Sequence, residues 1–311
     1  MWLRDLSGKR LYCFGDKERE SGKEVTQEQK QKIKHMEEMS LNAWPSYRIE
    51  FYDGWLLRYS HNYTYRTNSV EQVGESTIEP AEKILYCERI YRDLKSPSIF
   101  KIQPLLDKSF DQTLESLGYL IRHRTDVMTM NLSDSRLLKE SGKEYLFGNR
   151  LNLPTLVYYG DDTTVQLSAF VTDEWLKGLF SLNGTADPTL RRIVPKMYAA
   201  IPKKTIAASI EIDGRMVASG LGILDRDWVG IYAIYVSPSC WSRGYARAVC
   251  STLLSEAKTA GATKAYLQVV SDNRKAKSLY KSLGFSDFYT YWFRRKDMNS
   301  GAEYGQWVPK A

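Results

Sequence analysis

The stretch Val236-Ser-Pro-Ser-Cys-Trp-Ser-Arg-Gly-Tyr-Ala246 separates an apolar, aromatic segment from a segment of helical periodicity. Residues 228–236 are rich in β-branched and aromatic side chains, which predicts a strand. Residues 245–260 place apolar side chains at helical spacing, which predicts a helix. A strand that turns into a helix through a glycine-containing loop leaves unpaired N–H groups at the positive end of the helix dipole. The stretch therefore predicts a site for a phosphate-bearing ligand.

A second strand and helix follow. Residues 264–270 read as a strand, and the next helix carries Tyr280 and ends at Gly284-Phe285. Asn273 stands where a helix N-cap belongs. The whole pattern is V-x-P-x5-G-x-A, followed about thirty residues later by N-x-x-A-x-x-x-Y-x-x-L-G-F. It resembles the GNAT superfamily of acyl-CoA-dependent N-acyltransferases.

The resemblance implies roles for individual residues. The strand end around Tyr235 and Val236 would hold the pantetheine arm, the loop would wrap the pyrophosphate with its main-chain N–H groups, and Tyr280 would protonate the departing thiolate. The implied acyl-CoA-binding residues are Ile234, Tyr235, Val236, Ser242, Arg243, Gly244, Tyr245, Ala246, Arg247 and Asn273. Trp241 departs from the family pattern, which usually has Arg or Gln there. Because main-chain groups bind most of the phosphate in such loops, we still expect acetyl-CoA as the co-substrate.

An internal repeat is the second informative feature. A shift of 166 residues aligns Val70 with Val236, Phe100 with Tyr266, and Leu117-Gly118-Tyr119 with Leu283-Gly284-Phe285, without an insertion.

Under the same shift, the first copy has Ile78 opposite Gly244 and Leu114 opposite Tyr280. Three carboxylates, those of Glu71, Glu75 and Glu79, would lie where a pyrophosphate has to sit, and like charge there disfavours binding. The repeat therefore predicts tandem GNAT-like domains of which only the second keeps the chemistry.

The resemblance and the repeat together imply a mixed α/β (α+β) fold of two tandem GNAT-like domains, each a mostly antiparallel twisted sheet flanked by helices. Residues 64–70 read as a strand of a meander in the first domain. The expected divisions are a polar leader over 1–24, a degenerate GNAT-like domain over 25–132, a connector over 133–162, the catalytic GNAT domain over 163–297 and a C-terminal tail over 298–311.

The acceptor side is less defined by sequence. The resemblance places Phe180 and Asn183 in a helix and turn that line the acceptor site of many GNAT domains, and Tyr232 on a neighbouring strand. Aromatic walls with few carboxylates favour a small amine or amino acid over a polycationic aminoglycoside. The candidates for the general base stay open: Asp225, Asp227, Glu211, Tyr232 and a water relay.

The leading hypothesis is an N-acetyltransferase that moves an acetyl group from acetyl-CoA to a small primary amine by direct attack in a ternary complex. A peptide or protein N-acetyltransferase is the second enzyme hypothesis. A non-catalytic acyl-CoA-binding module is the alternative from another class.

The composition of the chain limits the kinds of binding partner that we expect. The chain has 311 residues, a formal net charge of +7 and a pI near 9.0, with basic and acidic residues interspersed. We expect neither nucleic-acid nor membrane binding, because the charges do not cluster and no apolar run approaches a membrane span. The four cysteines and three histidines lack metal-ligand spacing, so no metal is expected. The sequence predicts a cytoplasmic monomer or homodimer.

Overall fold

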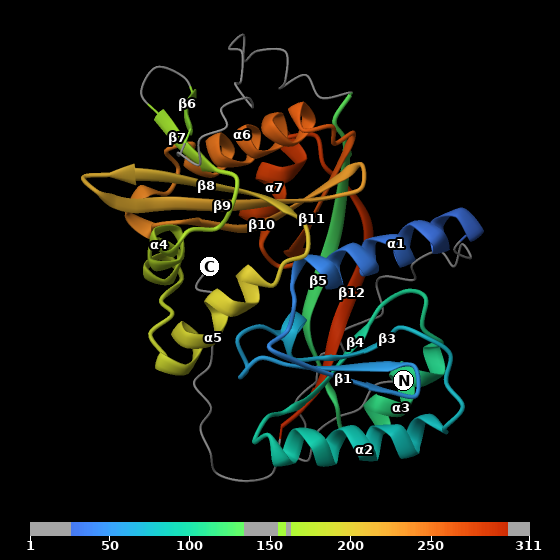
Figure 1. Ribbon diagram of the computed structural model, residues 1–311. Helices are drawn as coiled ribbons and strands as arrows, with labels where there is room; N and C mark the ends of the chain where they lie inside the picture. Colours follow the sequence, from blue (N-terminus) through green and yellow to red (C-terminus); the bar gives the residue numbers. More distant parts are fainter. Residues whose placement is uncertain (1–25, 134–154, 160–162, 298–311) are drawn as a thin grey trace, which may run out of the picture.

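The computed structural model describes residues 26–133, 155–159 and 163–297, so the predicted leader and tail and much of the connector lie outside the described residues. Helices cover both faces of one long sheet (Figure 1). No helix in the described ranges has the length and apolarity needed to cross a membrane. The elements of the first half are α1 (Gln27–Ala43), β1 (Arg48–Tyr52), β2 (Trp55–Tyr59), the 3-10 turn η1 (Tyr65–Thr67), β3 (Val70–Gln72), α2 (Pro80–Asp93), β4 (Ser98–Ile102), α3 (Lys108–Ser116) and β5 (Leu120–Asn131).

The second half repeats this order of strands after an additional hairpin, but two helices stand in the place of the first one. Its elements are β6 (Thr155–Tyr159), β7 (Thr163–Ser168), α4 (Asp173–Asn183), α5 (Pro188–Ala199), β8 (Lys204–Ile212), β9 (Arg215–Asp225), β10 (Trp228–Val236), the 3-10 turn η3 (Pro238–Cys240), α6 (Tyr245–Thr259), β11 (Lys264–Val270), α7 (Arg274–Ser282) and β12 (Ser286–Lys296).

The two halves exchange strands at the centre of the sheet. The strand order is β1-β2-β3-β4-β12-β5-β11-β10-β9-β8-β7-β6. The last strand of the second half, β12, therefore pairs with β4 of the first half, while β5 of the first half pairs with β11 of the second. The exchanged strands also pair with each other, antiparallel, from Ser286 opposite Thr129 to Arg295 opposite Leu120. The tandem α/β architecture is thus one continuous sheet.

The internal repeat is present in three dimensions, with one correction. Strands β4 and β5 and helix α3 begin 166 residues before β11, β12 and α7. Strand β3 does not follow this offset, because Leu57 pairs with Val70, whereas Ile223 pairs with Gly230. The structural counterpart of Val70 is therefore Gly230, and the prediction of a repeat without an insertion was wrong there.

The connection between β2 and β3 carries the extra residues. It spans residues 60–69, where the second half has only the turn at residues 226–227. Asn68 organises the connection, since its Oδ1 accepts from the N–H groups of Ser60 and Asn62 and its Nδ2 donates to the Thr64 carbonyl. The strand predicted over residues 64–70 was wrong, because these side-chain hydrogen bonds fold most of the segment into an ordered loop.

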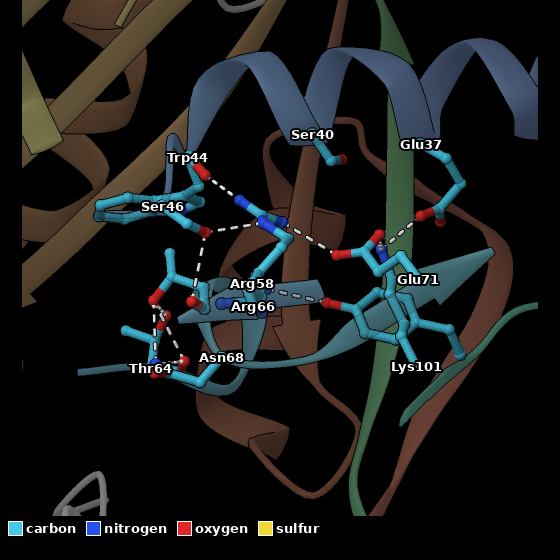
Figure 2. A network of polar contacts seen from close by, with 12 residues as sticks. Glu37, Ser40, Trp44, Ser46, Arg58, Thr64, Arg66, Asn68, Glu71 and Lys101 are labelled. Atoms are coloured by element: carbon cyan, nitrogen blue, oxygen red, sulfur yellow. Dashed lines mark hydrogen bonds and ion pairs between the residues drawn. The ribbon is translucent and has the colours of Figure 1, made fainter. Parts of the chain in front are cut away.

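A buried group of charges attaches α1 to the first half (Figure 2). Arg58 donates to Glu71 at 2.9 Å, and Lys101 contacts Glu37 of α1 and lies 3.5 Å from Glu71. Tyr289 of β12 also donates to Glu37, at 2.6 Å. Two cations face two carboxylates, so the buried charges compensate one another. Glu71, expected in the loop beside a pyrophosphate, is instead part of this network.

The strand exchange predicts that neither half folds alone. A chain of residues 155–311 lacks β5, so β11 exposes an edge and β12 loses both partners. We expect this fragment to be insoluble or non-cooperative in unfolding, and to become soluble when co-expressed with residues 1–133. Size-exclusion chromatography and circular dichroism of the separate and co-expressed fragments measure this. A fragment 155–311 that unfolds cooperatively as a monomer would contradict the prediction.

Candidate active site

A cavity opens where two parallel strands separate. β10 and β11 pair from Trp228 opposite Lys264 to Ile231 opposite Leu267, and no pairing between them continues beyond this point. A register shift between β10 and β9 follows at Tyr232/Tyr235, and Ala233 within it has φ +50°. A non-glycine residue in this conformation is strained, and such strain is common at functional sites. The resulting cavity has a volume of about 860 Å³.

The loop between β10 and α6 presents free amides to the cavity. Ser242 and Gly244 have φ values of +62° and +83°, and the latter caps α6 in the left-handed conformation. The N–H of Ala248 is the donor to the Gly244 carbonyl, so the amides before it have no acceptor within the helix. The first turn of α6 contains no acidic residue. This end of the helix is therefore suited to an anion.

The structure brings most of the sequence-predicted residues together around the cavity. Arg243 and Phe180 are the exceptions and do not line it: Arg243 is exposed, and Phe180 is buried in the core with residues of α5. The predicted residues that line the cavity are Asn183, Tyr232, Ile234, Tyr235, Val236, Ser242, Gly244, Tyr245, Ala246, Arg247, Asn273 and Tyr280.

The charge of the lining is positive. Among the described residues that line the cavity, none is Asp or Glu, whereas Arg66, Arg247 and Lys275 all contribute cationic side chains. Lys275 lies 5.4 Å from the ring centre of Trp241, whose indole N–H donates to the Val236 carbonyl. Trp241 thus closes the loop against β10 and supports a nearby cation, although it replaces the charged or polar residue usual at this position. The cavity suits a polyanionic ligand.

Tyr280 reaches the cavity from α7. Its side chain is 8% exposed and packs edge-on against Phe285, with ring centres 6.2 Å apart. Burial raises the pKa of Tyr280 well above its ordinary value, so the phenol keeps its proton at neutral pH. A neutral phenol in a cavity can donate a proton or a hydrogen bond. In the first copy, Leu114 holds the corresponding position and is fully buried.

The first half supplies one wall of the same cavity. The sequence did not identify the residues that form this wall. Thr64, Tyr65 and Arg66 enter from the β2–β3 connection, and His123 and Thr125 from β5. His123 has φ +46° and packs edge-on against Tyr65, at 4.4 Å between ring centres. Burial and the neighbouring Arg66, Arg295 and Arg122 lower the pKa of His123, so its imidazole is neutral near pH 7.

The carboxylates considered as general bases lie elsewhere. Asp225 accepts from Lys203 at 2.8 Å and from Asn42 at 3.0 Å, and Asp227 is paired with Lys264 at 2.9 Å. Glu211 is exposed on β8. None of these three lines the cavity. Tyr232 does, but burial raises its pKa to about 12, which makes it a proton donor rather than a base at neutral pH.

The matching loop of the first copy is filled by the protein itself. The Asp53 carboxylate accepts from the N–H groups of Thr77 and Ile78 at 2.9 to 3.0 Å, and from the Thr77 hydroxyl at 2.8 Å. Lys83, whose side chain is fully buried, pairs with the same carboxylate at 3.1 Å. Thr77 and Ile78 stand opposite Arg243 and Gly244 under the 166-residue shift and lie just before Glu79, the N-cap of α2. Asp53 therefore takes the hydrogen bonds that a phosphate would need, a feature that the sequence analysis missed.

Comparisons with known proteins agree with this geometry. Residues 173–285 match the family model described as "Acetyltransferase (GNAT) family". Residues 173–285 belong to the GNAT acetyltransferase family. The chain is therefore an acyltransferase with tandem GNAT-like halves, and the loop between β10 and α6 and Tyr280 both lie within the family match.

Relatives of this GNAT protein extend over both halves. The protein described as "Uncharacterized N-acetyltransferase YobR" of Bacillus subtilis (strain 168) is 25% identical over 272 residues, 85% of this chain and 98% of the relative. A GCN5-related N-acetyltransferase from Kribbella flavida shares the fold, with a TM-score of 0.58, 14% identity, and coverage of 86% of this chain and 96% of that one. A tandem GNAT protein from the clavulanic acid biosynthesis pathway gives a TM-score of 0.50 at 12% identity, over 73% and 74% of the two chains.

The filled loop of the first copy predicts a pH-dependent stabilisation. Hydrogen bonds from Ile78 and Thr77 hold the pKa of Asp53 far below its ordinary value. A carboxylate with a depressed pKa stabilises the fold above its unfolded-state pKa of about 3.9, and this stabilisation is lost as pH falls through the lower, folded-state pKa. We expect Asp53→Ala to lower the free energy of unfolding at pH 7, and the deficit to shrink below about pH 4.

Urea unfolding at a series of pH values measures this difference. Glu75→Ala is the matched control, because Glu75 is an exposed carboxylate of the same loop. Equal effects of the two substitutions at pH 7 would contradict the role given to Asp53.

Proposed function

We propose that the second copy transfers an acetyl group from acetyl-CoA to the primary amine of a small molecule, by direct attack in a ternary complex. The observation that carries the proposal is the cavity at the separated ends of β10 and β11, which combines a loop of free amides, a positive lining and a buried phenol. Acetyl-CoA would supply an activated acyl thioester there. A protein N-acetyltransferase and a non-catalytic acyl-CoA-binding module remain the alternatives.

The amides of residues 242–247 would hold the pyrophosphate, assisted by Arg247 and Lys275. Arg247 already donates to Ser282 of α7 at 2.6 Å, so its guanidinium is positioned beside the loop. The unpaired edge of β10 at residues 234–236 offers backbone groups for the amides of the pantetheine arm. Asn273, which caps α7 through its bond from the Ala276 N–H, also faces the cavity.

Tyr280 supplies the proton for the leaving thiolate. Its phenol is protonated at neutral pH, and no carboxylate of the described cavity lining competes for its hydrogen bond. The amine must lose a proton before it attacks, and the candidates for the acceptor narrow to His123 and water, because Asp225, Asp227 and Glu211 do not reach the cavity. Burial of the amine in a cavity without an acidic lining also favours its neutral form.

We expect acetyl-CoA to bind at one site per chain, since Asp53 fills the matching loop of the first copy. Gly244→Glu places a side chain on a residue with φ +83° and adds a negative charge beside the amides, so it should abolish binding. Gly118→Glu is the matched control, because Gly118 also has positive φ and open space but lies in the first half. Isothermal titration calorimetry measures the stoichiometry. Two acetyl-CoA sites in the unaltered protein would contradict the conclusion that the first copy does not bind acetyl-CoA.

Removal of the phenol should slow chemistry but not donor binding. Loss of a general acid typically costs 10²-fold or more in rate, so we expect Tyr280→Phe to lower kcat about 10²-fold while the Kd for acetyl-CoA changes less than about threefold. Release of free thiol during an amine screen measures turnover. A Tyr280→Phe protein with unchanged kcat would remove Tyr280 from the mechanism and leave the proton to solvent.

Cellular location and oligomeric state remain predictions from sequence. We retain a cytoplasmic monomer or homodimer that acts on a small amine, without nucleic-acid or membrane partners and without a metal. In the described ranges, no group of three or more His, Cys, Asp or Glu side chains is arranged to hold a metal ion.

A further inference from the structure

We propose that Arg66 of the first copy binds the carboxylate of the acceptor, so that the enzyme acetylates amino acids in preference to amines without a carboxylate. The inference rests on the proposed function and specifies its substrate class. Arg66 lines the cavity from the β2–β3 connection. Between the matched strand pairs Leu57/Val70 and Ile223/Gly230, the first copy has six more residues than the second. An ordered loop of extra residues that reaches a cavity is a frequent site of function.

Arg66 is a cation without an acidic partner in the described part of the chain. Its Nε donates to the Tyr291 hydroxyl at 2.8 Å. No Asp or Glu of the described residues forms an ion pair with its guanidinium. The nearby carboxylates of Glu37 and Glu71 are taken by Lys101 and Arg58. A guanidinium withdrawn from water without a carboxylate is destabilising unless a ligand compensates it. The free Nη groups can hold a carboxylate in two parallel hydrogen bonds.

A chain of hydrogen bonds fixes the direction of the Arg66 side chain. Tyr291 accepts from Arg66 and donates to the Gln268 Oε1 at 2.7 Å, and Gln268 in turn donates through Nε2 to the Ser40 hydroxyl at 2.5 Å. Each side chain in this chain donates a hydrogen bond to the next. The Nε end of the guanidinium is therefore held in place by Tyr291 of β12. The anchoring reduces the conformational entropy that Arg66 loses when a ligand binds.

The position of Arg66 separates it from the phosphate end of the cavity. Gln268, two hydrogen bonds away, directly follows Leu267, the last residue of β11 that pairs with β10. Arg66 thus lies near the point where the strands separate, whereas the loop amides begin beyond Val236. Val236 is five residues beyond Ile231, a separation of up to roughly 16 Å at 3.3 Å per residue. An anion at Arg66 is therefore not the pyrophosphate, and we assign it to the acceptor.

The rest of this end of the cavity suits an amino acid. Trp44, Tyr63, Tyr198 and Tyr232 provide aromatic surface, and the edge-on contacts of Trp44 with the three tyrosines, at 5.3 to 6.3 Å between ring centres, make that surface rigid. None of these four residues is charged. A ligand with one carboxylate, one amine and an apolar portion would thus find a cationic partner for its carboxylate only at Arg66 at this end of the described lining.

The test compares L-amino acids with their carboxamides, which keep the amine and the side chain but lose the negative charge. With acetyl-CoA as donor and thiol release as readout, we expect the unaltered enzyme to prefer the acid at least tenfold in kcat/KM. Arg66→Gln should raise the KM for the acid about 10- to 100-fold and change the KM for the amide less than about twofold. Arg66→Lys, which keeps the charge, should recover part of the loss.

Two further variants control for indirect effects. Arg122→Gln removes the same charge from an exposed residue beside His123 that does not line the cavity, and should leave the preference for acids unchanged. Tyr291→Phe removes the anchor but keeps Arg66, and should reduce the preference only severalfold. Thermal unfolding and the Kd for acetyl-CoA, both expected to be near those of the unaltered protein, show that Arg66→Gln is folded.

The outcomes separate this inference from the proposed function. Equal loss for acid and amide in Arg66→Gln, or a preference of the unaltered enzyme for the amide, overturns the role of Arg66 and leaves the acetyltransferase proposal standing. A selective loss of turnover with succinyl-CoA and a carboxylate-free amine would instead assign Arg66 to the acyl chain, and would also overturn the inference. If no amine is acetylated, the proposed function fails, and saturation-transfer NMR of acids and amides with the CoA-bound protein then decides the binding role alone.

Discussion

The exchange of β5 and β12 between the halves is the constraint on which the rest of the structure depends. Each exchanged strand supplies the neighbour that the other half needs, and the two pair with each other along nearly their full length. The first half is therefore held in one fixed position against the second. This fixed position brings His123 of β5 and Arg66, bonded to Tyr291 of β12, into the cavity of the second half. A first copy attached only by a linker could not place side chains so reproducibly.

The same strand–loop–helix arrangement occurs in both copies, but its backbone N–H groups have different partners in each. In both, a strand leads into a helix whose first amides have no acceptor within the helix. In the second copy no acidic residue lies near these amides, and they face the cavity. In the first copy the Asp53 carboxylate accepts from the N–H groups of Thr77 and Ile78, in the loop just before α2, and Lys83 neutralises it. The Glu75 carbonyl lies so close to Gly54 that no side chain fits there. A permanent internal anion thus replaces an exchangeable ligand, and the amides contribute to stability instead of binding.

The sequence predicted the architecture well because the deciding signals are local. The strand, loop and helix around residues 228–260 follow from side-chain pattern and glycine position, and the offset of 166 residues correctly matches α3 with α7 and β5 with β12. The ungapped alignment failed at β3. The first copy has a longer connection before this strand and a shorter segment after it, and the two differences in length cancel, so the alignment is correct again beyond them. Arg66 lies in that longer connection, and Asp53 accepts hydrogen bonds from residues more than twenty positions away. The roles of both residues therefore depend on tertiary contacts that a local sequence pattern does not show. A gapped alignment of the two copies would have drawn attention to residues 60–69.

The distribution of charge in the cavity bears directly on the chemistry. An amine is protonated in water, and the usual way to hold it would be a carboxylate, which would also stabilise the unreactive ammonium form. This cavity has no acidic side chain among its described lining residues, and it can recognise an amino acid through the other end of the molecule, at Arg66. The bound amine then gains no ion pair from the protein when it is protonated. Burial and the nearby guanidinium both lower its pKa, so a weak acceptor such as the neutral imidazole of His123, or water, suffices to release the nucleophile.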